Sequence, residues 1–155
     1  MAAIETANIF WVAVVTLLGC IKMARIARLV GNMRMKHKIM PPETTGPPEF
    51  IRSMRAQQNC IEFFILFVPL LWIAGIFFHQ VPASIFGTLY IYQRWEYFNG
   101  YVREAKQRLV HFKKSVNLLM VLLVMAAAGL VNTAANIYLN KDFLAPVFRI
   151  VGLAY

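Results

Sequence analysis

Three polar side chains that could bind a small charged molecule lie at the edge of a long apolar segment: Arg55, Asn59 and Glu62. Their spacings of i, i+4 and i+7 place them in one stripe along a helix face. No charged residue follows until Arg94, so this helix is predicted to enter a membrane. A charge at the centre of a membrane helix costs about 2.5–3.5 kcal/mol, which makes a charge at membrane depth a candidate functional group.

A second polar stripe is predicted on the following helix. It consists of Tyr97, Tyr101, Glu104 and Arg108, at spacings of i, i+4, i+7 and i+11. Both stripes approach the same membrane boundary and therefore lie at similar depth. Together they offer guanidinium groups, carboxylates, phenols and an amide, which suit a small zwitterion with two carboxylates. An arginine beside a thiol would also favour the thiolate, a nucleophile at neutral pH.

The same residues also fit a purely structural role. Arginine and glutamate one or two turns apart can pair with each other and so reduce the cost of burial. Tyrosines near a membrane boundary can form an aromatic belt. The spacing alone does not separate these interpretations. A metal site is not expected, because His37, His79 and His111 lie far apart and none has a partner at metal-ligand spacing.

Membrane helices are needed to position these stripes. Of the 155 residues, 59% are hydrophobic, against about 45–50% in soluble domains, so an all-α integral membrane protein is predicted. The uncharged run from 63 to 93 exceeds the roughly 20 residues that cross a bilayer, and Pro82 divides it. We expect one domain over residues 1–155, with transmembrane helices at about 6–36, 49–78, 82–108 and 112–138.

Charge predicts how this bundle is oriented. Short connections make the four neighbouring helices antiparallel. Fourteen of the sixteen Lys and Arg residues fall on the side of the first and third connections. By the positive-inside rule this side faces the cytosol, and both termini lie across the membrane. A net charge of +9 concentrated at a membrane boundary attracts anionic lipid head groups or an anionic substrate, so nucleic acid is not an expected partner.

Four segments carry a resemblance to a known family. They are residues 41–50 (PPETTGPPEF), 55–62 (RAQQNCIE), 71–78 (LWIAGIFF) and 97–101 (YFNGY), the last with Arg108. The pattern resembles the MAPEG family of membrane proteins in eicosanoid and glutathione metabolism. The resemblance implies a homotrimer of four-helix subunits in the endoplasmic reticulum or nuclear envelope. It also implies that glutathione, as co-substrate, binds between subunits near the cytosolic boundary, while a lipophilic electrophile such as leukotriene A4 enters through the membrane lipid.

The resemblance further implies roles for individual residues. Arg108 is the expected catalytic residue, since it would stabilise the glutathione thiolate. Arg34 and Gln57 would reach glutathione from an adjoining helix or subunit. The other expected glutathione-binding residues are Arg55, Asn59, Glu62, Tyr97 and Tyr101. The implied reaction is attack of the thiolate on an epoxide or another electrophile, so leukotriene C4 synthase activity and glutathione peroxidase activity both fall within the expected chemistry.

Two departures from the family pattern concern the substrate. Members specific for leukotriene A4 have a tyrosine where this chain has Phe63 and a second arginine where it has Met35. Both changes favour a broader transferase. The alternative is a non-catalytic lipid-binding scaffold like the five-lipoxygenase-activating protein of the same family, which lacks the arginines that match Arg55 and Arg108. Because this chain has both, a glutathione transferase is the preferred prediction.

Overall fold

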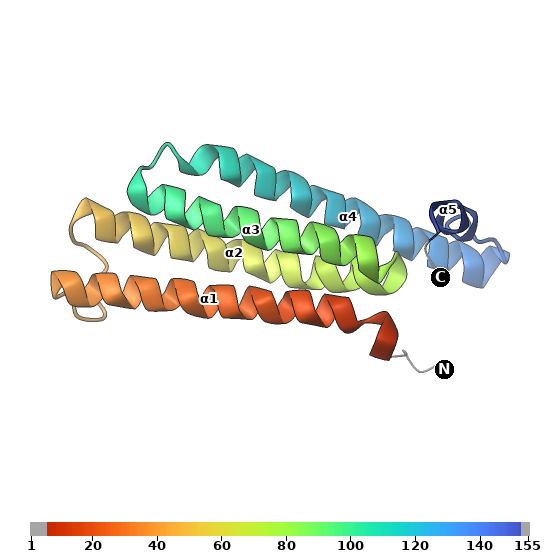
Figure 1. Cartoon of the computed structure of the whole chain (residues 1–155), viewed down its shortest axis with the longest axis horizontal. Helices are drawn as coiled ribbons and strands as arrows, with labels where there is room; N and C mark the ends of the chain where they lie inside the picture. Colours follow the sequence, from red (N-terminus) through yellow and green to blue (C-terminus); the bar gives the residue numbers. More distant parts are fainter. Residues whose placement is uncertain (1–5, 153–155) are drawn as a thin grey trace.

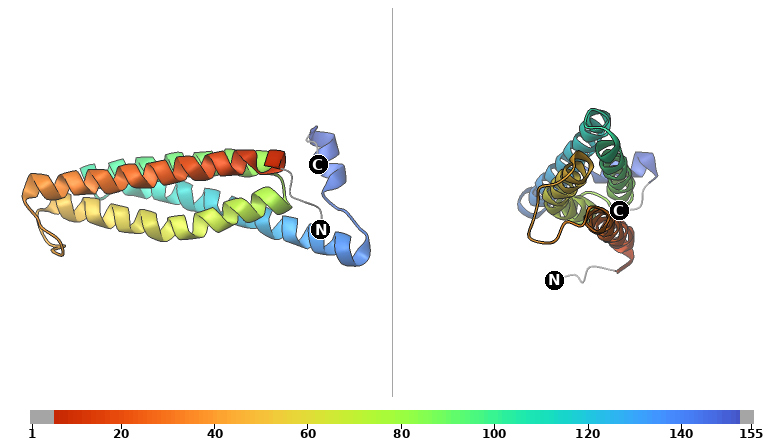
Figure 2. Two further views of the ribbon diagram at one scale, coloured as in Figure 1. Left: turned by 90° about the horizontal axis from the view of Figure 1, so that it is seen from below. Right: turned by 90° about the vertical axis from the view of Figure 1, so that its left-hand side faces the viewer.

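Four long helices lie side by side in this computed structural model, which describes residues 6–152 (Figure 1). They are α1 (Phe10–His37), α2 (Pro48–Phe77), α3 (Gln80–Arg103) and α4 (Arg108–Leu139), preceded by the 3₁₀ helix η1 (Thr6–Asn8) and followed by α5 (Ala145–Val151). Consecutive long helices run in opposite directions, so α1 begins and α4 ends toward the same end (Figure 2). The prediction of an all-α chain is confirmed for these residues. Residues 1–5 and 153–155 of the expected domain lie outside the described part.

Among the described helices, α1, α2 and α4 are long and apolar enough to cross a membrane. Much of their apolar surface points outward, and Leu17, Ile65 and Val124 are 62%, 67% and 65% exposed. Such surface is unfavourable in water by about 25 cal/mol per Å², so these faces suit lipid or another subunit. The sequence predicts four spans, but α3 is not among the helices that are long and apolar enough to cross a membrane. Polar residues such as Gln93 and Arg94 interrupt α3, which packs against the other three long helices.

One glycine and one proline affect how the long helices pack and bend. A Cβ atom at Gly129 would lie 2.5 Å from the backbone of Phe77, so only glycine lets α4 pass this closely to the end of α2. Pro69 lies inside α2, where it removes one helical hydrogen bond. Helices commonly kink at such a residue, and α2 is curved in Figure 2.

The end of the third helix differs most from the sequence prediction. That helix is predicted to reach about Arg108, but α3 ends at Arg103, and Glu104 has extended backbone angles of φ −150° and ψ 135°. The connection that follows is exposed, so another helical turn would bury no apolar side chain and would lack the packing that stabilises most helices. Arg108 is the first residue of α4. Its placement on the same helix as Tyr97 and Tyr101 is therefore wrong.

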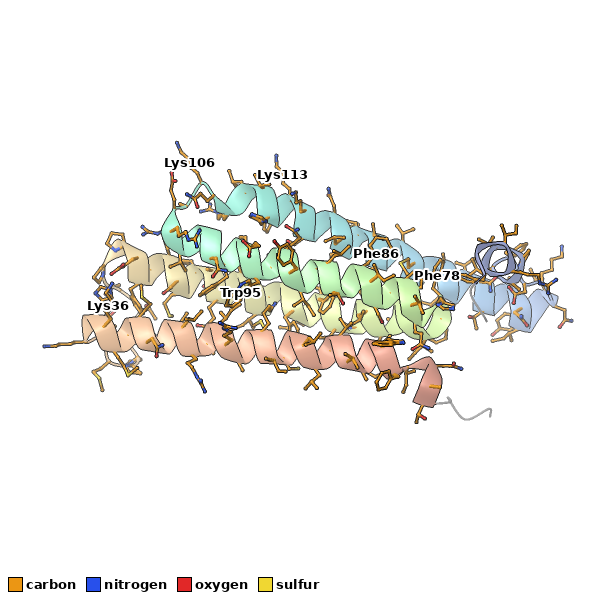
Figure 3. The ribbon with its side chains drawn as sticks, viewed as in Figure 1. Lys36, Phe78, Phe86, Trp95, Lys106 and Lys113 are labelled. Atoms are coloured by element: carbon orange, nitrogen blue, oxygen red, sulfur yellow. The ribbon has the colours of Figure 1, made fainter. Side chains whose placement is uncertain are left out.

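Basic side chains gather at one end of the bundle. The α1–α2 and α3–α4 connections both lie there (Figure 1). Lys36 and Lys106 project from this end, and Lys113 lies along the first turns of α4 (Figure 3). Here the Lys36 Nζ and His37 Nε2 atoms lie 2.9 and 2.6 Å from the Glu49 carboxylate, and these contacts join the end of α1 to the start of α2.

Candidate functional site

A groove of about 400 Å³ opens between α2, α3 and the start of α4. Six of the eight site residues expected from the sequence line it: Arg55, Asn59, Glu62, Tyr97, Tyr101 and Arg108. The lining is completed by Gln58, Leu109 and Phe112. The fold thus brings the two predicted stripes to one groove, although the second stripe comes from two helices rather than one.

The first wall of the groove is one face of α2. The Asn59 side chain is half-buried, whereas Arg55 and Glu62 are exposed. The Asn59 Nδ2 atom donates to the Glu62 Oε2 atom at 3.5 Å, which is long for a hydrogen bond. Gln58 belongs to the same face, since it lies three residues after Arg55 and four before Glu62, and this spacing could have identified it from the sequence.

Tyr97, Tyr101 and Arg108 form the opposite wall. The guanidinium carbon of Arg108 lies 4.3 Å from the centre of the Tyr101 ring, within the range of cation–π attraction. The Tyr101 ring packs edge-on against that of Tyr97, with ring centres 5.8 Å apart. The α3–α4 connection therefore folds Arg108 back over α3 and holds its charge at the groove.

The start of α4 adds a second source of positive potential. Arg108 and Leu109 are its first residues, and both line the groove. Backbone N–H groups in the first turn of a helix have no intrahelical acceptor, and together they act as roughly half a positive charge. The preceding residue, Gln107, makes no side-chain cap to these groups, and of the two the Leu109 amide donates to the Lys106 carbonyl oxygen at 3.2 Å. An anion would therefore be favoured at this wall.

Ion pairs within residues 6–152 involve only the carboxylate of Glu49, with Lys36 and His37. In this part of the chain, the guanidinium groups of Arg55 and Arg108 have no carboxylate within ion-pair distance. The interpretation that the arginine and glutamate of the first stripe simply pair with each other is therefore wrong. Their charges are left to interact with a ligand or with solvent.

Arg34 and Gln57 do not line the groove. The Arg34 Nη1 atom donates to the Glu43 carbonyl oxygen at 2.7 Å, and its guanidinium covers the Phe50 ring at 5.1 Å. The Glu43 carboxylate accepts hydrogen bonds from the Thr45 hydroxyl and backbone amide, which hold the pKa of Glu43 below its usual value. Gln57 is half-buried on α2. A contribution of either residue to this kind of groove would have to come from another copy of the chain.

Arg94, to which the sequence assigns no role in the site, lies inside the bundle and contacts two residues that line the groove. Its side chain is fully buried. The Arg94 Nη2 atom donates to the Asn59 Oδ1 atom at 2.9 Å, and the guanidinium carbon lies 4.4 Å from the centre of the Tyr97 ring. The available signal is its position, since it is the first charge after 31 uncharged residues and lies three residues before Tyr97.

A second groove, of about 450 Å³, lies between α1 and α3. Its lining is mostly apolar and includes Trp11, Ile85 and Leu89, with the hydroxyl groups of Ser84 and Thr88 as its polar side chains. Unlike the first groove, it carries no charged side chain. Within residues 6–152, no group of three or more His, Cys, Asp or Glu side chains is placed to hold a metal ion.

Comparison with known proteins identifies the family. The model of the MAPEG family matches residues 12–128. The chain is 42% identical over 142 residues to microsomal glutathione S-transferase 2 of Homo sapiens, and the aligned residues cover 92% of this chain and 97% of that protein. It is 48% identical over 118 residues to leukotriene C4 synthase of Bos taurus, and here the aligned residues cover 76% of this chain and 79% of that protein. These matches confirm the resemblance seen in the sequence, and the chain belongs to the MAPEG family.

Proposed function

We propose that this protein is a membrane-bound glutathione transferase that conjugates glutathione to lipophilic electrophiles, with leukotriene A4 among its substrates. One observation carries the proposal. Two arginines that lack a carboxylate partner among the described residues meet a carboxylate and two phenols in one groove of a membrane protein. The names of the relatives, microsomal glutathione S-transferase 2 and leukotriene C4 synthase, agree with this chemistry.

The polar groups of the groove complement those of glutathione. Glutathione carries two carboxylates, an ammonium group and a thiol. The Arg55 guanidinium suits a carboxylate, because its N–H groups can form a bidentate pair, and Glu62 suits the ammonium group. Asn59 and the phenols of Tyr97 and Tyr101 suit the peptide groups. These five residues would hold the co-substrate in place.

Arg108 is the proposed catalytic residue. Its guanidinium and the positive field at the start of α4 would lower the pKa of the bound thiol and favour the thiolate. The thiol proton passes to solvent, the sulfur bonds to an epoxide carbon as the C–O bond breaks, and the alkoxide takes a proton from solvent. The same thiolate could attack a peroxide, giving an alcohol and a glutathione sulfenic acid that a second glutathione converts to disulfide and water.

The range of electrophiles is proposed to be broad. Met35 is 72% exposed at the end of α1. Phe63 packs edge-on against Phe112, with ring centres 5.6 Å apart. Neither side chain can donate a hydrogen bond or carry a charge, so they would not select for leukotriene A4 through polar contacts. Shape and apolarity would then decide which electrophiles react.

A homotrimer completes the proposed site. Exposed apolar helix faces support contacts between subunits. Arg34 and Gln57 do not reach the groove of their own chain, so each would line the groove of a neighbour. α3 would form the fourth span, shielded by the helices around it. The basic end would face the cytosol by the positive-inside rule, at the membrane of the endoplasmic reticulum or nuclear envelope.

Turnover in nanodiscs tests this function. The purified protein is given glutathione with either leukotriene A4 or a general aryl halide, and we expect a thioether from both. A non-catalytic lipid-binding scaffold like five-lipoxygenase-activating protein would give neither product, and this result from a folded sample would contradict the transferase. Conjugation of leukotriene A4 alone would contradict the broad range of electrophiles.

A further inference from the structure

Arg94 is a buried cation on α3 without a carboxylate partner in the described part of the chain. Its side chain is 0% exposed, and the ion pairs of residues 6–152 involve only Glu49. Its Nε and Nη1 atoms have no hydrogen-bond partner. A buried charge is unfavourable unless it is paired and hydrogen-bonded. A buried arginine with two nitrogen atoms that lack hydrogen-bond partners is therefore unusual and points to a specific role.

The direction of the Arg94 side chain is set by its neighbours. The guanidinium carbon lies 4.9 Å from the centre of the Phe63 ring and 4.4 Å from that of Tyr97, and both rings attract a cation. The Cys60 thiol donates to the backbone carbonyl of Arg94 at 4.0 Å, which joins α2 to α3 at this level. The guanidinium is thus enclosed and directed toward the residues that line the groove.

The hydrogen bond from Arg94 determines how the Asn59 amide is turned. Arg94 Nη2 donates to Asn59 Oδ1 at 2.9 Å, so the amide oxygen faces the interior of the bundle. The amide nitrogen then faces the groove and lies 3.5 Å from Glu62 Oε2. A guanidinium has no acceptor, so the reverse orientation of the amide would place two donors against each other. Asn59 therefore presents N–H groups to whatever occupies the groove.

We infer that Arg94 is a positioning residue for glutathione, which acts through Asn59 by holding its amide as a hydrogen-bond donor and adds a fixed positive charge behind the groove. The inference rests on the proposed function and deepens it. The ligand group selected beside Asn59 is an oxygen acceptor, best an anionic one such as a carboxylate of glutathione. Arg94 itself does not line the groove and touches neither the ligand nor the reacting atoms.

A double-mutant cycle tests this coupling in nanodiscs. The variants are Arg94→Met, Asn59→Ala and the double substitution. Each single change should raise Kd and KM for glutathione by roughly 10-fold, as expected for a lost hydrogen bond to a charged group. The kcat at saturating glutathione should stay within about 2-fold, because the reacting atoms are not touched. The double variant should bind no more weakly than the weaker single variant, since the two residues act as one unit.

Arg25→Met is the matched control. The Arg25 guanidinium carbon lies 5.0 Å from the centre of the Trp95 ring, so the variant loses a similar cation–π contact. Arg25 is exposed on α1 and does not line the groove, so the KM for glutathione should not change. If Arg94→Met does not fold, Arg94→Lys keeps the charge but loses the planar fork, and it should still raise KM.

The outcomes separate this inference from the proposed function. If wild-type protein binds glutathione but the folded Arg94 variant has an unchanged KM, the positioning role is wrong and the transferase stands. Independent, multiplying effects of Arg94 and Asn59 would overturn the coupling in the same way. A lowered kcat with unchanged KM would also overturn it. Failure of wild-type protein to bind glutathione would overturn both proposals.

Discussion

Replacement of Arg108 by methionine removes a charge from the groove but keeps an apolar side chain over the Tyr101 ring. Two opposite unit charges about 4 Å apart attract each other by about 4 kcal/mol at an effective dielectric constant of about 20, and by about 1 kcal/mol in bulk water. Arg108 is half-buried, so its interaction with a bound thiolate should fall between these limits. Since about 1.4 kcal/mol corresponds to one pKa unit, the pKa of the bound glutathione thiol should rise by roughly one to three units.

The expected loss of activity depends on pH. A thiol with a raised pKa is less ionised at neutral pH, so Arg108→Met should lower kcat for conjugation at pH 7 by roughly 10- to 1,000-fold. The loss should shrink as the pH rises toward 9, where the thiol ionises without help from the guanidinium. The assay is kcat with an aryl halide at saturating glutathione between pH 6 and pH 9, together with the ultraviolet absorbance of the bound thiolate.

Arg103→Met is the control for this experiment. Arg103 is an exposed arginine at the end of α3 that does not line the groove, so its replacement should leave kcat unchanged. Wild-type activity of a folded Arg108→Met protein at pH 7 would refute the reasoning. A loss of equal size at every pH would refute it as well, because that result would assign Arg108 to holding the ligand rather than to ionising the thiol.

Further predictions concern the assembly, the helix packing and the C-terminal segment. Arg34→Ala and Arg55→Ala should each strongly lower activity at subsaturating glutathione, but equal co-expression should restore about a quarter of the activity, because about one interface in three of a mixed trimer, and so about one in four over all trimers, combines two intact partners; inactive mixed trimers would contradict a shared site. Gly129→Ala should lower Tm in detergent, since its Cβ would lie 2.5 Å from backbone atoms and overpacking costs about 1–3 kcal/mol; an unchanged Tm would argue against this close approach. The Asp142 carboxylate accepts a hydrogen bond from the Ala145 amide, which keeps the pKa of Asp142 below its ordinary value of 3.8. Because the pKa is lowered by folding, docking of α5 should be complete above about pH 4 and lost as the pH falls through the lowered value, and Asp142→Ala should speed hydrogen exchange in α5 at pH 7; unchanged exchange would contradict this role.

The first stripe could be predicted from the sequence because a helix fixes the direction of every side chain on it. Once α2 forms, the spacing of Arg55, Asn59 and Glu62 places all three on one face. The end of α3 could not be predicted in the same way. No Gly or Pro lies between Arg103 and Arg108, and the helix stops where apolar packing runs out, which depends on the neighbouring helices. Because α3 ends at Arg103, Arg108 belongs to α4 and its side chain lies back over Tyr101 of α3.

The arrangement of side chains and the contacts between helices decide what spacing leaves open. Spacing allows Arg55 and Glu62 to pair, and only the arrangement of their side chains shows that they do not. The burial of Arg94 between the rings of Phe63 and Tyr97 depends on how α2 faces α3. Neither is encoded in the periodicity of a single helix.

Calorimetric titration of glutathione into the protein in nanodiscs measures directly whether the groove binds this co-substrate. We expect saturable binding with one site per chain. Arg55→Met should weaken this binding by roughly 10-fold or more, as expected when a charge-assisted hydrogen bond to a carboxylate is lost, whereas Arg103→Met should leave it unchanged. Absence of glutathione binding by folded wild-type protein, or equal binding by the Arg55→Met variant, would contradict the proposed site.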